Sequence, residues 1–407
     1  MEPWRKNLYI LWATQLLAMV GMNLVVPFLP FYIRELGITD QEQLAQWSGL
    51  VFAAPFLTAF IATPFWGAMG DKHGQKLMVI RAIFGLGVSQ ILQGFSQDAY
   101  QLLFFRILQG GISGFIASVI ALVSSSTPKE KIGYALGILQ SSTAGGLVLG
   151  PAVGGFLADL VGFRSIFFVV AALCFVGGLV IIKFVHESPR IKTESDKPSV
   201  LHNIKYMVTH PQLRVISIVI VLSQAAALMI EPIFALFIES FKTETRYLST
   251  LTGMIFAIAG IFMVISSPWW GRRNDRLGYK KNLIMALTGT GIAYVCHSIV
   301  SHLIVLGFIR ALLGFARGGI LHTLFSLTNN HAPSERKSGL IGIASSFSIL
   351  GNMLGPLAGG WVAGTFGITH VFLISGMIFF LTIGVVWKYL NEIPRSLPDE
   401  VAKIAEY

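Results

Sequence analysis

The chain has 407 residues, of which 54% are hydrophobic and 12% are charged, whereas ordinary globular chains carry roughly 25% charged residues. This composition excludes a soluble enzyme and predicts an integral membrane protein. The net charge of +10 comes from basic residues between apolar stretches, so it indicates membrane topology and not nucleic-acid binding. Cys174 and Cys296 both lie in apolar stretches, so we expect neither a disulfide framework nor a thiolate metal site.

Twelve apolar stretches follow one another along the chain, and each is long enough to cross about 30 Å of hydrocarbon as an α-helix. They cover residues 8–31, 47–69, 77–96, 100–125, 134–158 and 164–184, and then 213–238, 250–270, 282–300, 303–328, 339–363 and 368–389. The loops between them are short, which leaves no room for a separate soluble domain. We therefore predict an all-α membrane protein with twelve transmembrane helices.

The longest polar stretch, Glu187 to His210, separates six predicted spans from six. We predict an N-terminal six-helix bundle at 1–186, a cytoplasmic linker at 187–212, a C-terminal six-helix bundle at 213–390 and a cytoplasmic tail at 391–407. Placing both termini in the cytoplasm puts most of the 30 Lys and Arg residues in cytoplasmic loops. We expect a multi-pass monomer in the lipid bilayer of the cell inner membrane.

The two halves repeat each other at a nearly constant spacing. Thr63–Gly67 (TPFWG), with Asp71, Lys72 and Gly74 after it, recurs 204 positions later as Ser267–Gly271 (SPWWG), with Asp275, Arg276 and Gly278 after it. Arg106 and Gly110 recur as Arg310 and Gly314, and the GPxxGG motif at Gly150–Gly155 recurs at Gly355–Gly360. Repeats of this kind predict two pseudo-symmetric halves with a substrate site between them, near the middle of the membrane.

These motifs resemble those of the major facilitator superfamily over nearly the whole chain. The loop Gly67-x-x-x-Asp71-Lys72-x-Gly74-x-Lys76 resembles the signature loop of the superfamily, and Gly150-Pro151-x-x-Gly154-Gly155 resembles the motif of its antiporter branches. Pro27 to Pro30 and Arg106-x-x-Gln109-Gly110 resemble its drug:proton antiporter family. The resemblance implies a proton-coupled antiporter that exports lipophilic drugs or related small molecules by alternating access.

Two other classes of function stay open. One is a narrow-specificity transporter, either an exporter of an endogenous metabolite such as a siderophore or lipid, or a nutrient symporter, although the antiporter motif disfavours uptake. The other is a receptor or scaffold, which the short loops disfavour. The chain contains no Walker loop, metal-ligand cluster or nucleophile constellation, so we expect no catalytic residue, metal or cofactor and a transport driven by an ion gradient or by the substrate itself.

The signature loops suggest a conformational latch. A helix N-terminus stabilises an exposed carboxylate by about 0.3–1 kcal/mol, and we expect Asp71 to face the start of the eleventh span near Lys337 to Gly339. By symmetry, Asp275 is expected to face the start of the fifth span near Gly133. The residues of the expected latch are Gly67, Asp71, Lys72, Gly74, Lys76, Asp275 and Arg276. The alternative is that they are local turn and capping residues.

The fifth span carries a stripe of small residues, Gly146, Gly150, Gly154 and Gly155, together with Pro151. Small residues permit close approach of helices, and proline removes one backbone hydrogen bond. The pattern indicates a bending or tightly packed helix at the interface of the halves. Ordinary helix packing is the alternative.

Charged side chains within membrane spans usually face a cavity or a partner. Glu231 is the only acidic residue well inside a predicted span, and Glu231-Pro232 places it at an interrupted helix. Arg310 is predicted at a similar depth, so we expect Glu231 and Arg310 to couple proton movement to transport. A purely structural Glu231–Arg310 ion pair is the alternative, and Arg317 with His322 is a second candidate for shuttling protons.

Polar side chains on the same spans indicate the substrate cavity. Arg106 and Gln109 are expected to orient a polar group of a substrate, or to bind Gln15 or Asn23 in the first span. Flexible apolar residues nearby suit varied lipophilic ligands. The expected lining consists of Gln15, Met19, Met22, Asn23, Arg106, Gln109, Gln224, Met229, Phe234 and Phe256.

Overall fold

The computed structural model describes residues 2–112, 114–187, 200–242 and 247–392 of the chain. In this part the chain forms helices without β-strands, and 11 of the helical segments are long and apolar enough to cross a membrane. The remaining predicted span, 282–300, corresponds to α13 (Tyr279–His297). Its first turn contains two lysines, yet it packs beside α17 (Ile368–Tyr389) like the other spans. The protein is therefore an all-α multi-pass membrane protein, as predicted.

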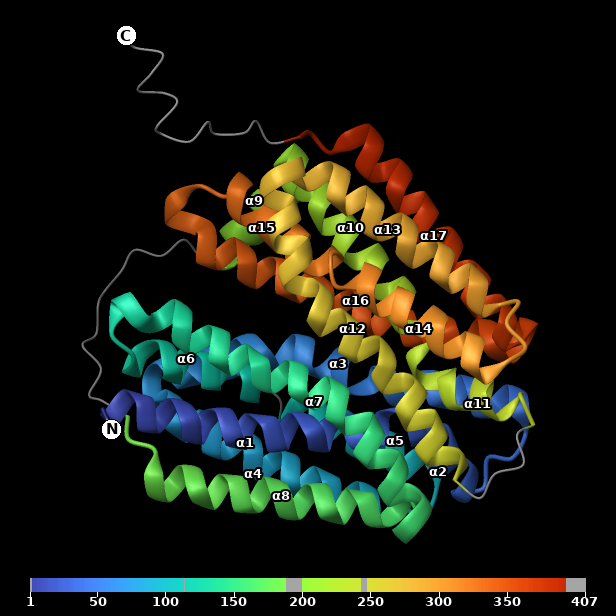
Figure 1. Cartoon of the computed structure of the whole chain (residues 1–407). Helices are drawn as coiled ribbons and strands as arrows, with labels where there is room; N and C mark the ends of the chain where they lie inside the picture. Colours follow the sequence, from blue (N-terminus) through green and yellow to red (C-terminus); the bar gives the residue numbers. More distant parts are fainter. Residues whose placement is uncertain (1, 113, 188–199, 243–246, 393–407) are drawn as a thin grey trace.

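Figure 1 shows the helices arranged as two bundles, one blue to green and the other yellow-green to red. The first bundle contains α1 (Pro3–Val25), η1 (Val26–Phe28), α2 (Leu29–Glu35), α3 (Gln41–His73), α4 (Gln75–Gly94), α5 (Ala99–Gly111), α6 (Phe115–Ser126), η2 (Lys129–Lys131), α7 (Ile132–Val161) and α8 (Phe163–Phe184). The second contains α9 (Val200–Thr209), α10 (Pro211–Leu228), η3 (Glu231–Ile233), α11 (Phe234–Glu239), α12 (Leu248–Leu277), α13, α14 (Leu303–Arg317), α15 (Ile320–His331), η4 (Ser334–Arg336), α16 (Lys337–Phe366) and α17.

The region expected to be a linker contains a helix, α9, which packs against α10 and α16 of the second bundle. Residues 188–199 of this region lie outside the described residues, as does most of the expected tail. The assignment of 187–212 as a cytoplasmic linker stays a prediction.

Four of the predicted spans are interrupted. The breaks at Pro27 and Pro232 follow from proline, which cannot donate a backbone hydrogen bond. The breaks after α5 and α14 were not predicted. Trp66 Nε1 donates a hydrogen bond to the carbonyl of Gly111 at 2.8 Å, and Trp270 Nε1 donates to that of Phe315 at 2.7 Å. The tryptophans of the repeated TPFWG and SPWWG segments therefore bind carbonyl groups at these breaks, as a membrane interior requires.

The glycine stripe of α7 faces α1 within the first bundle. A Cβ atom at Gly146 would meet Met19, one at Gly150 would meet Asn23, and one at Gly154 would meet the carbonyl oxygen of Leu24. Helix α7 is tightly packed and lies at the interface of the halves, as predicted, but the face with Gly146, Gly150 and Gly154 does not form that interface. Each fourth residue of a helix lies on the same face, and in α7 that face is used for packing within one half.

Two pairs of helices join the halves. The carbonyl oxygen of Pro151 in α7 lies against Gly253 of α12, and the carbonyl oxygen of Pro356 in α16 lies against Gly49 of α3. Both proline positions belong to the repeated GPxxGG motif, so the motif contributes to the interface through its proline. Glycine on the facing helix makes this approach possible because any larger side chain would collide with the carbonyl group.

The halves diverge toward the other end of these helices. Gly137 and Gly155 are 18 residues apart, which is five turns, so they lie on one face of α7. A Cβ atom at Gly155 would meet the backbone of Ser249, whereas one at Gly137 would meet nothing within 4 Å. On α16, Gly360 lies against α3, and Gly342 again has nothing within 4 Å. The halves are thus closed together at the end that holds α2 and α11, which we call the closed end (Figure 1).

We predict that Gly154→Val lowers the free energy of unfolding by about 1–3 kcal/mol, because its side chain collides with the backbone of α1. Gly384→Val is the matched control, because Gly384 also lies in a helix and has nothing within 4 Å of its Cβ position. Thermal unfolding in detergent measures both variants. Equal unfolding temperatures for the two would show that the α1–α7 contact does not need glycine.

Candidate functional site

Glu231 forms an ion pair with Arg317. Glu231 begins η3, at the break between α10 and α11, and its Oε1 accepts a hydrogen bond from Arg317 Nη1 at 3.1 Å. The two side chains are 18% and 25% exposed. The alternative of a Glu231–Arg310 ion pair is wrong, and a role of Glu231 and Arg310 in proton coupling stays a prediction. Arg317 is the last residue of α14, and the unpredicted break that follows α14 brings its guanidinium group level with the break at Glu231.

Arg310 is held by aromatic rings. Its guanidinium carbon lies 4.0 Å from the ring centroid of Phe234 and 4.9 Å from that of Phe256, and its Nε donates to the carbonyl of Ile255 at 3.4 Å. The side chain is only 6% exposed. A desolvated cation over an aromatic face is stabilised by about 2 kcal/mol. Arg310 therefore keeps its charge beside Glu231 without forming an ion pair to it.

The three charged groups line one cavity between the halves. Its volume is about 30 Å³ in this conformer. Leu147 of α7 supplies the wall from the first half, and the second half supplies Glu231, Phe256, Ala259, Gly260, Met263, Arg310, Leu313, Gly314 and Arg317. A smaller hollow adjoins Glu231 and Arg310 and is lined by Phe234, Phe256 and Tyr294. A substrate site between the halves stays a prediction.

The cavity is lined by two guanidinium groups and one carboxyl group, so basic side chains outnumber acidic ones. Most of the rest of the lining is apolar. This combination of an apolar wall with a few converging polar groups is typical of small-molecule sites. Phe256 lines the cavity, both Phe234 and Phe256 line the smaller hollow, and both pack on Arg310, whereas their contact with a substrate stays a prediction.

Tyr294 was not predicted, although it lines the smaller hollow and is almost fully buried. Its hydroxyl group donates to the carbonyl of Ala227 at 3.2 Å, near the break that precedes Glu231. The predicted proton-shuttle residue His322 is exposed on α15 and is not among the residues that line these two cavities. The sequence signal for Tyr294 was a polar hydroxyl group in one of the less apolar spans, and this signal was not used.

The predicted cavity residues of the first span make packing contacts within the first half. Gln15 Nε2 donates to Thr143 Oγ1 of α7 at 2.9 Å, and Asn23 Nδ2 donates to the carbonyl of Met19 at 2.8 Å. Met19 is buried against Gly146, whereas Met22 is exposed. The glycine stripe of α7 explains this arrangement, because it draws α1 close. Contact of these residues with a substrate stays a prediction.

The predicted residues of the seventh span behave in the same way in the second half. Gln224 Nε2 donates to Asn352 Oδ1 of α16 at 3.1 Å. Met229 is buried, and its sulfur accepts a hydrogen bond from Ser375 Oγ at 3.7 Å. Their roles in a substrate cavity also stay predictions.

Arg106 and Gln109 belong to one buried polar cluster. Gln109 Oε1 accepts hydrogen bonds from Arg106 Nη1 at 3.4 Å and from Gln93 Nε2 at 3.2 Å. The alternative in which Arg106 binds Gln15 or Asn23 is not seen among the described residues, where Arg106 donates to Gln109. Gln93 was missed because a glutamine in a span gives no charge signal.

The signature loop is held by a carboxylate that the sequence did not single out. Glu187 accepts hydrogen bonds from the backbone N–H groups of Gln75 at 2.7 Å and Lys76 at 3.0 Å, which are the first residues of α4. Gly74 has φ = +99°, and a Cβ atom there would meet the Glu187 carboxylate. Lys76 Nζ also donates to the carbonyl of Ile182 at 3.1 Å. Gly74 and Lys76 therefore fix the loop within the first half.

The second half repeats this contact. Gly278 has φ = +91°, and Glu392 accepts a hydrogen bond from the backbone N–H of Lys280 at 3.3 Å. Lys280 Nζ donates to the carbonyl of Trp387 at 2.9 Å. Glu187 and Glu392 are 205 positions apart, so the sequence repeat extends to both capping carboxylates.

The latch itself stays a prediction. Asp71 is exposed, and its Oδ1 accepts a hydrogen bond from Gln75 Nε2 at 3.4 Å. The start of α16, where Asp71 was expected, has Gly339 against Asn203 of α9. The side chain of Asp275 lies outside the described part of the structure. Lys72 and Arg276 occupy the last turns of α3 and α12, and a Cβ atom at Gly67 would meet nothing within 4 Å.

We predict that Glu231 and Arg317 couple energetically. A double-mutant cycle with Glu231→Gln and Arg317→Gln should give an interaction energy of about 0.5–3 kcal/mol in thermal unfolding experiments. The same cycle with Arg310→Gln in place of Arg317→Gln is the control. It should give a smaller interaction energy, because Arg310 makes cation–π contacts with two rings and a hydrogen bond to a carbonyl group instead. A larger coupling for Arg310 than for Arg317 would contradict the observed pairing.

The chain is similar in sequence to known proteins. The sequence model of the Major Facilitator Superfamily matches residues 11–266 and 234–405 of the chain. The chain is 36% identical over 387 residues to the multidrug resistance protein MdtG of Klebsiella pneumoniae (strain 342), which covers 93% of this chain and 92% of that protein. It is 33% identical over 399 residues to MdtG of Escherichia coli O1:K1 / APEC, which covers 97% of both proteins.

Solved structures show the same arrangement of helices. A crystal structure of the nucleoside transporter NupG superposes with a TM-score of 0.76 at 14% identity, over 96% of this chain and all of that chain. A bacterial homolog of the human lysosomal transporter Spinster, in an inward-facing and unoccupied conformation, superposes with a TM-score of 0.77 at 14% identity, over 95% of this chain and 97% of that chain. At these identities the likeness shows the fold alone.

Proposed function

Because the chain belongs to the Major Facilitator Superfamily, a family of non-enzymatic membrane transporters, we propose that it is a proton-coupled antiporter that exports lipophilic drugs or related small molecules across the inner membrane by alternating access. The observation that carries this proposal is the Glu231–Arg317 ion pair in the wall of an apolar cavity between the halves. The relatives named for multidrug resistance support the substrate class.

Glu231 is the group in this cavity that binds and releases a proton. Protonation removes the negative partner of Arg317 and adds one positive charge to a cavity that already holds Arg310. A cationic compound is then repelled more strongly, and its binding in turn favours release of the proton, since linkage between two ligands is reciprocal. Competition of this sign, combined with exposure to the two sides in turn, exchanges a proton for a substrate.

A second function is favoured by the excess of guanidinium groups. A cavity with more basic than acidic side chains attracts anions, and for an anion the sign of the coupling reverses, so that proton and substrate bind together. The protein would then be a narrow-specificity symporter of an anionic metabolite. Transport of three compounds matched in size but anionic, neutral and cationic distinguishes the two functions: proton movement opposite to the substrate supports antiport.

The packing of the halves indicates from which side of the membrane the cavity is reached. If both termini lie in the cytoplasm, the closed end faces outward and the cavity is reached from the cytoplasm. Asp71 and Asp275 then lie at the end that must close in the other half of the cycle. We assign them to a latch at that end.

We predict that Glu231→Gln abolishes uphill transport driven by a pH gradient but leaves exchange of substrate across the membrane within about twofold. An amide keeps the shape of the side chain and loses the titrating group. Proteoliposomes with an imposed pH gradient measure the first property, and counterflow without a gradient measures the second.

Glu42→Gln serves as the control for Glu231→Gln, because Glu42 is an exposed acid in the first turn of α3. Uphill transport by a well-folded Glu231→Gln protein would rule out this mechanism. Loss of folded protein and of all transport modes together would instead assign Glu231 a structural role.

We also predict that Asp71→Asn slows transport by about twofold to fivefold while leaving substrate affinity unchanged. The size follows from the roughly 0.3–1 kcal/mol that a helix N-terminus contributes to an exposed carboxylate. Transport into everted vesicles and equilibrium binding to purified protein are measured side by side. Transport at the wild-type rate would remove Asp71 from the latch.

A further inference from the structure

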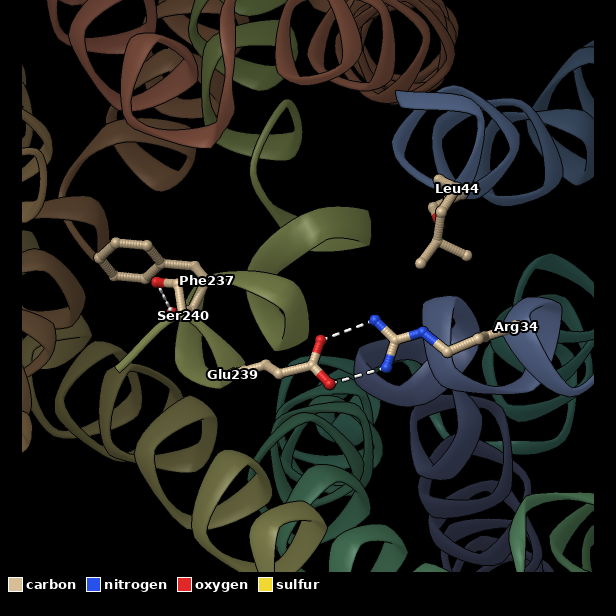
Figure 2. Close-up of polar contacts among 6 residues, drawn as sticks. Arg34, Leu44, Phe237, Glu239 and Ser240 are labelled. Atoms are coloured by element: carbon tan, nitrogen blue, oxygen red, sulfur yellow. Dashed lines mark hydrogen bonds and ion pairs between the residues drawn. The ribbon is translucent and has the colours of Figure 1, made fainter. Parts of the chain in front are cut away.

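An ion pair away from the cavity joins the two halves, in addition to the Glu231–Arg317 pair, which lies within the second half. Arg34, near the end of α2, donates from Nη1 to Oε1 and from Nη2 to Oε2 of Glu239, both at 2.7 Å. Figure 2 shows the guanidinium and carboxylate groups facing each other edge to edge, with two parallel hydrogen bonds. This bidentate geometry is the strongest form of arginine–carboxylate contact. Glu239 is the last residue of α11, so the bonds run from one half to the other.

The pair occupies equivalent positions of the two halves. Arg34 and Glu239 are 205 positions apart, which is the spacing that relates Gly150 to Gly355. Helices α2 and α11 each follow the proline break in the first membrane span of their half. Equivalent positions meet where the pseudo-symmetry axis passes between the halves. Identical charged residues there would repel each other, whereas the opposite charges of Arg34 and Glu239 attract.

A second carboxylate crosses between the halves at the same end. Asp159, near the end of α7, accepts hydrogen bonds from the backbone N–H of Thr250 at 2.7 Å, its hydroxyl group at 2.6 Å, and the N–H of Ser249 at 3.2 Å. These N–H groups belong to the first turn of α12, which has no intrahelical acceptor for them. The closed end is therefore held by directional polar contacts as well as by glycine packing.

We propose that Arg34 and Glu239 form the latch of the closed end and set the equilibrium between this conformer and the one open at that end. This inference rests on alternating access as proposed above, and it concerns positioning residues that do not touch the cavity. In the other conformer, α2 and α11 separate and the ion pair breaks. Both side chains are about one third exposed, at 31% and 34%, so water can solvate them when they part.

The size of the effect follows from this partial exposure. Partly exposed ion pairs of good geometry stabilise by amounts equivalent to about a fivefold change in an equilibrium constant. Loss of the pair should raise the population of the conformer open at this end by about that factor. A latch of this strength holds the conformer without trapping it, as a transport cycle requires.

The test uses charge reversal and a charge swap in the full-length protein. The variants are Arg34→Glu, Glu239→Arg and the double variant with both changes. Each is made in a chain whose Cys174 and Cys296 are replaced by alanine and that carries one reporter, either Ser249→Cys at the closed end or Gly342→Cys at the open end. A membrane-impermeant maleimide in excess measures the accessibility of the reporter, without substrate or pH gradient.

Each single reversal should raise the labelling rate of Ser249→Cys about fivefold and lower that of Gly342→Cys, and the double variant should return both rates to those of the unaltered pair. Glu35→Arg is the matched control at the same helix end. Its charged neighbour is Arg164 of the same half, so its reversal should leave both rates unchanged. Size-exclusion chromatography confirms that each variant is folded.

The latch is refuted if the single reversals label like the unaltered protein, or if the swap fails to restore the rate. Failure of the proposed function gives a different pattern. Reporters that change in the same direction would refute alternating access, whereas a normal labelling pattern without proton-driven transport would refute proton coupling and leave the latch in place.

Discussion

Backbone-to-backbone contact at glycine is the constraint on which the rest of this structure depends. Lipid does not drive apolar helices together as water does, so close packing has to supply the association. Within each half, glycines let α7 reach α1 and let α16 reach α10: Gly154 lies against the carbonyl of Leu24, and Gly359 lies against that of Met229. Between the halves, Gly253 and Gly49 admit the carbonyl oxygens of the two motif prolines. The halves therefore meet mainly along two helix pairs, α7 with α12 and α3 with α16.

The cavity is a consequence of where helices break inside these halves. The break at Pro232 leaves Glu231 at the end of an interrupted helix, and the break after Arg317 ends α14 opposite it. A continuous helix at either place would carry these side chains past each other. The tryptophans that bind carbonyl groups at the breaks come from the neighbouring helices α3 and α12, which also contribute to the seam between the halves. Trp270 of α12 thus contacts the last turn of α14, the helix that carries Arg317.

Carboxylates on helix N-termini recur through the molecule and differ in what they join. Glu187 caps α4 and Glu392 contacts the first turn of α13, in each case inside one half. Asp159 caps α12 from the opposite half. The first two fix the signature loops to their own bundle. The Asp159 contact and the Arg34–Glu239 ion pair instead connect the two halves, so they are the contacts that the proposed alternating access would break.

The sequence by itself determined the class of protein, its helices and its internal repeat, because these depend on the length of apolar stretches and on residues compared at a fixed spacing. It also identified Glu231 and its proline break, since a lone acid in a span is visible without any partner. The partner was decided only by tertiary structure: Arg310 and Arg317 both lie on α14, and which one reaches Glu231 depends on where α14 ends, at Gly318, which apolar periodicity does not reveal. The sequence also did not determine which helix each motif glycine faces. A stripe of small residues permits close approach of a helix but does not identify that helix. The closed end, with Arg34 against Glu239, required the two halves to be placed side by side, since residues 205 positions apart interact only when the fold brings them together.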